Sequence, residues 1–192
     1  MTARAPSPLE LVVDDEILLR AAFLTPPEDM YALVDRNRAY LGRFLPFATA
    51  EYGLEQAREF VLRSKDAWAG DSERGYTVHC LGELVGAIGL HGLSAPNRIA
   101  TIGYWLSEDR QGRGIVTRSV RALIELAFAQ YGLNQIGIRA ATTNLPSRAI
   151  PERLGFVHTG HERQTLVNGH GELQDGEVYS LLRSEWQQLR RR

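Results

Sequence analysis

Cysteine is almost absent from this chain of 192 residues: Cys80 is the only one, which excludes an internal disulfide. Cys80 follows Tyr76 and Val78 at alternating apolar positions of a predicted strand, and this favours a place in the core over a role as a nucleophile. No apolar run is long enough to span a bilayer, and the first ten residues lack the apolar stretch of a secretory signal. We therefore expect a cytoplasmic protein.

An excess of either charge is also lacking. The chain has 22 Lys and Arg residues against 23 Asp and Glu residues, a net charge of −1, so we expect neither nucleic acid nor a membrane as a partner. Its five histidines show no metal-ligand spacing on a helix, so no metal site is expected. Repeats, linkers and low-complexity segments are missing too. We therefore expect one domain over residues 1–192.

The first half of the chain predicts local, antiparallel structure. Residues 9–20 read as two short strands joined at Asp14 and Asp15. A helix is expected to begin after Thr25, which can cap it, with Glu28 at capping-box spacing. A second amphipathic helix covers residues 54–68. The next segment predicts a hairpin with a type II′ turn at Gly82 and Glu83.

The second half alternates strands with helices. Strands are expected at residues 98–106 and 135–141, then near 157–167 and 178–182, and helices at 115–130 and 147–154. Gly132 follows the first of these helices at the position where a helix end favours glycine. An antiparallel start followed by a strand-helix-strand connection predicts a mixed sheet.

A turn with two glycines, Gly112 and Gly114, lies between a predicted strand and the helix that starts at Ile115. Glycine lets the backbone approach a ligand closely, and the free N–H groups and dipole of a helix N-terminus favour a pyrophosphate. The dinucleotide-binding pattern fails because Thr117 stands where a third glycine is needed, and no Gly-Lys-Ser/Thr triplet follows. A purely structural turn stays open on these residues alone.

Further segments are more specific than the two glycines. These are IGYWL (102–106), NRAYLGRFLPF (37–47), the pattern Asn-x-x-Ser that leads to Leu-Gly-Phe (144–156), and VYSLLRSEW (178–186). Together with Gln-Gly-Arg-Gly-Ile-Val (111–116), they resemble the GNAT superfamily of acyl-CoA N-acyltransferases, in its RimL/RimJ-like branch that acetylates protein N-termini. Val116 departs from the superfamily pattern, where Gly or Ala is usual, but bulky apolar residues are familiar there in this branch.

The resemblance implies an α+β GNAT fold with a central mixed, mostly antiparallel sheet of six to seven strands flanked by about four helices. It implies acetyl-CoA as the cosubstrate, with the strand at 99–106 splayed from its neighbour so that Trp105 and Leu106 meet the pantetheine arm. Asn144, which can also simply cap the next helix, would hold the pantetheine as well. The remaining cofactor-binding residues would be Gln111, Gly112, Arg113, Gly114, Ile115, Val116 and Thr117.

Acyl transfer from a thioester needs a neutral amine, a donor for the developing oxyanion and a proton source for the departing thiolate. The family motif makes Ser147 the candidate acid, although a serine at a helix start is also a common cap. A hydroxyl is a weak acid and a thiolate with a pKa near ~8.5 does not strongly demand one. Loss of Ser147 should therefore slow the reaction without abolishing it.

The general base is the least defined part of the site. The family often has a glutamate where Thr165 or Leu166 stands here. We take the nearby Glu162 as the candidate base, and leave open Glu172, Asp175 and Glu177 in the loop beyond it, or no base at all. An α-amine with a pKa of ~7.7–8.0 is roughly a tenth neutral at pH 7, whereas lysine is under about a thousandth. The missing glutamate thus mildly favours an α-amine acceptor over lysine.

Three functions are consistent with the sequence. The first is a cytoplasmic acetyl-CoA-dependent N-acetyltransferase that modifies the N-terminal α-amine of a protein, with a ribosomal protein as the expected acceptor. The second is the same reaction on a small amine such as a polyamine, an amino acid or an antibiotic. The third is an acyl-CoA-binding module without catalysis. The resemblance also leads us to expect a homodimer.

Overall fold

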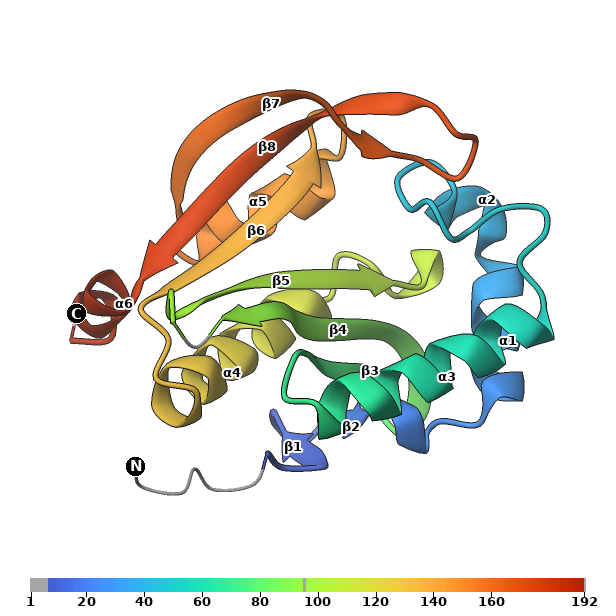
Figure 1. Ribbon diagram of the computed structural model, residues 1–192, viewed down its shortest axis with the longest axis horizontal. Helices are drawn as coiled ribbons and strands as arrows, with labels where there is room; N and C mark the ends of the chain where they lie inside the picture. Colours follow the sequence, from blue (N-terminus) through green and yellow to red (C-terminus); the bar gives the residue numbers. More distant parts are fainter. Residues whose placement is uncertain (1–6, 95, 192) are drawn as a thin grey trace.

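The computed structural model describes residues 7–94 and 96–191. Its described residues form one eight-stranded sheet in the order β1-β2-β3-β4-β5-β6-β8-β7 (Figure 1). The strands are β1 (Glu10–Val12), β2 (Ile17–Ala21), β3 (Arg74–Cys80), β4 (Glu83–Ser94), β5 (Ile99–Leu106), β6 (Gln135–Ala141), β7 (Val157–Val167) and β8 (Leu173–Leu182). The helices are α1 (Pro27–Arg36), α2 (Arg38–Leu41), α3 (Leu54–Ala69), α4 (Ile115–Gln130), α5 (Leu145–Arg153) and α6 (Arg183–Leu189), with short 3-10 helices η1 (Ala22–Leu24) and η2 (Glu108–Arg110).

The predicted α+β architecture with a mixed, mostly antiparallel sheet is confirmed, with one or two strands and two helices more than expected. Every neighbouring pair of strands is antiparallel except β5 and β6, which run parallel and are joined through α4. Their pairing covers Ile99–Thr101 of β5 against Gln135–Gly137 of β6. Beyond these residues the two strands are no longer paired, and this opening is the structural basis of the site.

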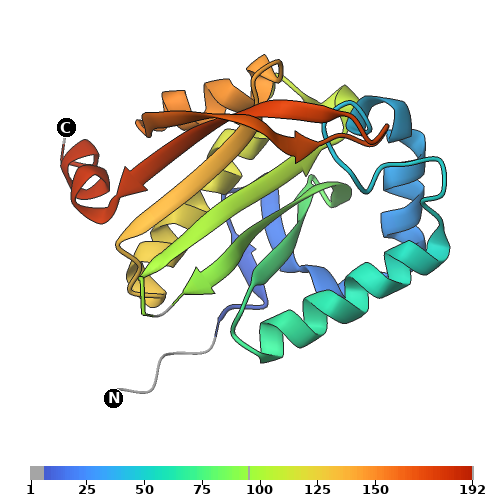
Figure 2. The same ribbon diagram turned by 45° about the horizontal axis from the view of Figure 1, so that its top comes forward.

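Two apolar clusters hold the layers together. In the larger one, Val120, Leu123 and Ile124 of α4 are fully buried with residues of the sheet and of α5 and α6. Complete burial of such a side chain contributes about 1.5–3 kcal/mol. The second cluster lies under α1, α2 and α3 and reaches β5 through Trp105. Because α4 lies on one face of the sheet and α1 and α3 on the other, both faces near β5 are covered (Figures 1 and 2).

The prediction of a type II′ turn at Gly82 and Glu83 is wrong. Cys80 pairs with Glu83, so the two-residue turn consists of Leu81 and Gly82. Both have positive φ, 52° and 83°, as a type I′ turn requires. Glycine is the residue expected at positive φ, so the leucine at the first turn position did not indicate a type I′ turn.

The expected cap of the first helix is also wrong. The helix begins after Pro26 and has no side-chain cap, while the hydroxyl of Thr25 is buried and bonds that of Thr77 at 2.9 Å. The same helix ends at Asn37, which separates α1 from α2. The Asn37 side chain donates to the Leu33 carbonyl and accepts from the backbone N–H of Glu108 at 2.9 Å. A buried asparagine therefore connects the α1–α2 break to the segment before the glycine turn.

Other local predictions hold. The α4 and β6 bounds agree with those expected, and Gly132 has a φ of 61° just after α4. Cys80 is buried in the larger cluster. Two details nevertheless differ from expectation: the last strand begins at Leu173, earlier than predicted, and α6 was not predicted. Among the described residues, no helix is long and apolar enough to cross a membrane.

Candidate active site

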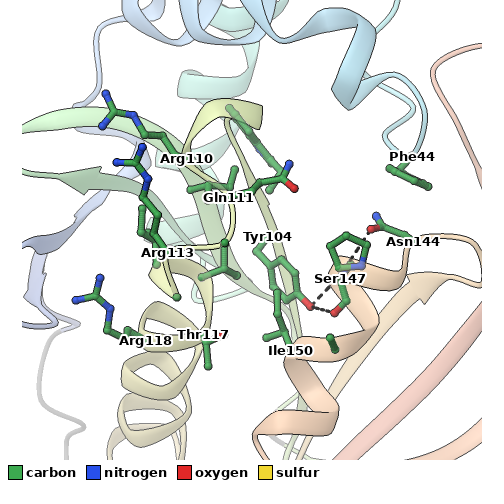
Figure 3. A pocket seen from close by; sticks show the side chains of 18 of the residues that line it. Phe44, Tyr104, Arg110, Gln111, Arg113, Thr117, Arg118, Asn144, Ser147 and Ile150 are labelled. Carbon is green, nitrogen blue, oxygen red and sulfur yellow. Dashed lines mark hydrogen bonds between the residues drawn. The ribbon is translucent and has the colours of Figure 1, made fainter.

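A cleft with a volume of about 520 Å³ lies where β5 and β6 separate. The C-terminal half of β5, the turn before α4, and α5 line it, with Phe44 and its neighbours at one end (Figure 3). Trp105 and Leu106, expected at a pantetheine arm, both line this cleft, as do all seven residues from Gln111 to Thr117. The structure therefore brings the predicted cofactor residues together, including Asn144, and places the candidate acid Ser147 beside them.

The N-terminus of α4 is built to receive an anion. Gly112 and Gly114 have φ values of 73° and 70°, in the region that favours glycine, and Gly114 precedes the first helical residue. No side chain caps this helix, and its first hydrogen bond from Arg118 N–H to the Gly114 carbonyl measures 3.0 Å. The buried Ile115 anchors the turn in the core. The preceding N–H groups of the first turn are thus left for a ligand, where the helix dipole favours negative charge.

The arginines around this turn are not equivalent. Arg110 is ion-paired with Glu83 and Asp109, and Arg118 lies 2.8 Å from Asp14 and 2.9 Å from Glu16. In contrast, Arg113 lines the cleft and forms no ion pair with the described residues. Much of the positive charge of Arg110 and Arg118 is therefore compensated by the protein itself, and Arg113 is the better candidate for a phosphate.

Ser147 is fixed in the cleft by two neighbours. Its backbone N–H donates to Asn144 Oδ1 at 3.2 Å, so Asn144 caps α5 as predicted. Its hydroxyl donates to the Tyr104 hydroxyl at 3.3 Å, and the Tyr104 hydroxyl donates to the Ser147 carbonyl at 2.9 Å (Figure 3). Burial raises the pKa of Tyr104 well above its usual range, so this phenol stays neutral. Ser147 therefore faces the cleft in a defined orientation beside a neutral hydroxyl.

Tyr104 is a site residue that sequence reasoning missed. It stands next to Trp105 in the IGYWL segment, where the strand pattern predicts only that the two side chains point to opposite faces. Both nevertheless line the cleft, because β5 is no longer paired with β6 there. The single available signal was the motif itself.

Gln111 marks the point where the cleft continues into a second cavity. Its Nε2 is buried and has no hydrogen-bond partner among the described residues. A buried amide donor left unpaired costs about 1–3 kcal/mol. Gln111 lines both the cleft and the adjoining cavity, so a polar atom of a bound thioester or acceptor can satisfy it. This unpaired donor fits a site that is completed by its ligand.

The second cavity, of about 440 Å³, lies between the α2 region and the loop that joins β7 to β8. Five residues line both this cavity and the cleft, namely Tyr40, Phe44, Gln111, Asn144 and Pro146. The other wall of the second cavity carries His170 and Glu172. The loop lies beside α2 in both views, and the Gly169 N–H donates to the Gly42 carbonyl at 2.7 Å (Figures 1 and 2). An acceptor in this cavity would therefore meet a thioester in the cleft.

The candidate bases are placed very differently. Glu172 lines the second cavity, whereas Glu162, Asp175 and Glu177 line neither cavity. Glu162 lies 2.7 Å from Arg139 and accepts from the Thr165 hydroxyl at 3.2 Å. Its role as a base stays a prediction, which would need a chain of water to reach the cleft.

Glu177 is a buried carboxylate with a structural setting. It accepts from His158 at 2.6 Å, from His161 at 3.0 Å and from the Thr142 hydroxyl at 3.1 Å. The hydrogen bonds from His161 and His158 lower the pKa of Glu177 to about 2, and the bond to Glu177 raises the pKa of His161. A carboxylate held this firmly in its charged form is a poor proton acceptor.

Among the described residues, no group of three or more His, Cys, Asp or Glu side chains is placed to hold a metal ion.

Comparison with known proteins relates the chain to acetyltransferases. Residues 17–157 match the model of the acetyltransferase (GNAT) domain family. The chain is 38% identical to the "Putative ribosomal N-acetyltransferase YdaF" of Bacillus subtilis, over 91% of this chain and 96% of that protein. It is 28% identical to the "Ribosomal-protein-serine acetyltransferase" of Escherichia coli, over 79% and 85%.

A solved structure of similar fold was found as well. It is described as RimL, a ribosomal L7/L12 alpha-N-protein acetyltransferase, in complex with coenzyme A. The TM-score is 0.86 and the sequence identity 25%, with 92% of this chain and 99% of that chain covered. The likeness thus extends over nearly the whole of both molecules.

Proposed function

Because the chain belongs to the GNAT acetyltransferase family, we propose that it transfers the acetyl group of acetyl-CoA to the N-terminal α-amine of a protein, and that a ribosomal protein is its natural acceptor. The observation that carries this proposal is the continuity of the two cavities at Gln111, Asn144 and Pro146. It lets donor and acceptor bind together, so the amine attacks the thioester directly in a ternary complex. The relatives named as ribosomal-protein acetyltransferases support the choice of acceptor.

In this proposal the chain holds acetyl-CoA along the cleft. The N–H groups of the α4 first turn and the Arg113 guanidinium would bind the diphosphate, because both favour anions at close range. The unpaired edge of β5 at Trp105 and Leu106, together with Asn144, would hold the pantetheine arm. Residues 1–192 would act as one N-acetyltransferase domain.

Ser147 would stabilise the leaving group. As the C–N bond forms and the C–S bond breaks, negative charge develops on sulfur, and the Ser147 hydroxyl can turn from Tyr104 to donate to it. Tyr104 would keep the Ser147 carbonyl and side chain in place while it does so. The proton lost by the amine nitrogen can go to water or, through water, to Glu162. An α-amine needs little help, since roughly a tenth is already neutral at pH 7.

Release of free thiol from acetyl-CoA tests the proposal directly. The purified protein is assayed with peptides that begin with Ser, Ala or Met, with the same peptides blocked at the α-amine, and with a panel of small amines. We expect turnover of open peptides that disappears on blocking. Selective turnover of a polyamine, amino acid or antibiotic would instead establish the small-amine function.

We also propose that the protein is a homodimer. β7 is an edge strand of 11 residues that pairs with β8 on one side, and most of its residues are exposed. Val157, Val167 and Leu173 add exposed apolar surface to this hairpin. Long exposed edges are usually covered in native proteins. Light scattering during size exclusion should give twice the chain mass of 21.5 kDa, and a monomer at micromolar concentration would contradict the proposal.

A further inference from the structure

The second cavity carries opposite charges on its two walls. Arg43, next to α2, lies on one wall, and Glu172, in the β7–β8 loop, lies on the other. Both side chains belong to exposed residues, and neither forms an ion pair within the described part of the chain. His170 is the other titratable side chain of the loop that lines this cavity. Two separate charges facing one cavity are available for a ligand.

Glu172 is held in place by the buried Asn168, which is only 4% exposed. Asn168 Nδ2 donates to Glu172 Oε2 at 2.8 Å, and Asn168 Oδ1 accepts from the backbone N–H groups of His170 and Glu172 at 2.9 Å and 3.0 Å. The amide thus fixes both the loop backbone and one carboxylate oxygen. A carboxylate positioned in advance binds a cation with less loss of side-chain entropy.

Arg43 is positioned by aromatic rings. Its guanidinium carbon lies 4.8 Å from the centre of the Tyr40 ring and 5.4 Å from that of the Phe44 ring. Both rings line the same cavity. A guanidinium supported in this way keeps its N–H donors free for a planar, bidentate contact with a carboxylate.

The two walls are joined by backbone contacts. Besides the bond from Gly169 N–H to the Gly42 carbonyl, the Gln174 side chain donates to the Arg43 carbonyl at 3.1 Å. A Cβ atom at Gly169 would lie 2.7 Å from the Ala48 carbonyl oxygen and 2.8 Å from Gly42 Cα. The backbones approach so closely that the fold sets the spacing of the two walls from which Arg43 and Glu172 project. A cavity of about 440 Å³ is large enough for a few residues of an extended peptide.

We propose that Glu172 binds the ammonium group of the acceptor and that Arg43 binds an acidic side chain within the first residues of the same acceptor. This inference rests on the proposed function and specifies its substrate class: N-termini followed by Asp or Glu. About nine-tenths of an α-amine is charged at pH 7, so a carboxylate on the approach captures the abundant form. The bound ammonium then loses one proton to water, and the neutral amine moves on to attack the thioester. The guanidinium repels a second cation, and this disfavours polyamines and N-termini followed by Lys or Arg.

Charge reversal provides the sharpest test. Two peptides are compared that differ only in Asp or Lys at positions two and three, and kcat/KM is measured for each. For the unmodified chain we expect the Asp peptide to be preferred about tenfold or more, a typical effect of one well-placed charge pair in a partly desolvated site. Arg43→Gln should remove the preference and Arg43→Glu should reverse it. Glu172→Gln should raise KM for both peptides about three- to tenfold with little change in kcat.

Two control variants test whether the effects are specific to Arg43 and Glu172. Arg63→Gln and Glu59→Gln change exposed α3 residues of the same types away from both cavities, and should leave the preference unchanged. Titration calorimetry with acetyl-CoA shows whether each variant is folded and retains the cleft. Equal turnover of both peptides by the unmodified chain, or an Arg43→Glu variant that keeps the preference for Asp, would overturn this inference alone. Failure to acetylate any open peptide would instead overturn the proposed function, and this inference with it.

Discussion

At the scale of single residues, Ser147 and Tyr104 are joined by two hydrogen bonds. The Ser147 hydroxyl donates to the Tyr104 hydroxyl, and the Tyr104 hydroxyl donates to the Ser147 carbonyl. We expect Ser147→Ala to lower kcat about tenfold, the low end for acid catalysis, because a thiolate is a good leaving group. Tyr104→Phe should also lower kcat, by disordering Ser147, with KM for acetyl-CoA little changed. Steady-state kinetics with a saturating peptide measures both effects.

The double variant decides whether the two residues are coupled. If Tyr104 works through Ser147, adding Tyr104→Phe to Ser147→Ala should cost almost nothing more in kcat. Fully additive losses would show that Tyr104 acts by itself. Thermal unfolding of each variant shows whether a lower kcat comes from a loss of stability. For Tyr104→Phe the free energy of unfolding should fall by about 1–2 kcal/mol, because the Ser147 carbonyl loses its hydrogen-bond partner.

Glu177 makes stability depend on pH in a predictable direction. Its folded pKa of about 2 lies below the ordinary value of 4.5, mainly because His161 and His158 donate to it. A depressed carboxyl pKa stabilises the fold above the unfolded value, and the contribution is lost as pH falls from about 4.5 toward 2. His161, whose pKa is raised, contributes below its ordinary value of 6.5 and loses its contribution as pH rises through the folded pKa. The Tm should therefore fall as the pH drops from about 4.5 toward 2, and also as the pH rises above about 6.5.

The matching variant is Glu177→Gln. It keeps the side-chain shape but removes the charge, so its Tm should vary less than that of the unmodified chain both between pH 4.5 and 2 and above pH 6.5. Differential scanning calorimetry across pH 2 to 8 makes the comparison. An identical pH dependence in both proteins would show that other groups control it.

At the scale of elements, substitutions at the two ends of α4 distinguish acetyl-CoA binding from stability. Gly114 has a φ of 70° beside the cleft, and Gly132 has a φ of 61° at the other end of the same helix. Alanine at either position should cost about 1–2 kcal/mol of stability, because a Cβ disfavours the left-handed region. Only Gly114→Ala also alters the turn proposed to hold the diphosphate, so we expect its Kd for acetyl-CoA to rise about tenfold while that of Gly132→Ala stays unchanged. Calorimetric titration checks both, and a similar Kd for the two variants would contradict an anion site there.

The elements also show how far the sequence could lead. Strong helical periodicity and a glycine after the last turn predicted α4 correctly, because local signals dominate a long amphipathic helix. No local pattern marks the break between α1 and α2, because Asn37 at this break accepts a hydrogen bond from the backbone N–H of Glu108, far along the chain. In the same way, the motif supplied Ser147 and Asn144, but Tyr104 enters the cleft only because β5 and β6 stop pairing. The position of Glu172 depends on a loop that docks on α2, which no local pattern encodes.

At the scale of the whole molecule, the contact of Gly42 with Gly169 joins two distant parts of the chain beside the second cavity, where we propose that the acceptor binds. We expect Gly169→Ala to force the walls apart, because its Cβ would lie within 3.0 Å of backbone atoms, and to lower stability by about 1–3 kcal/mol. The KM for peptides should rise severalfold and the Kd for acetyl-CoA less, because Tyr40 and Phe44 beside Gly42 line both cavities whereas the turn before α4 lies away from this contact. Gly160→Ala is the matched control. Gly160 lies on the same hairpin, and a Cβ atom there would have no neighbour within 4 Å. If Gly169→Ala weakened acetyl-CoA binding as strongly as peptide turnover, the two cavities would not be separate sites for donor and acceptor.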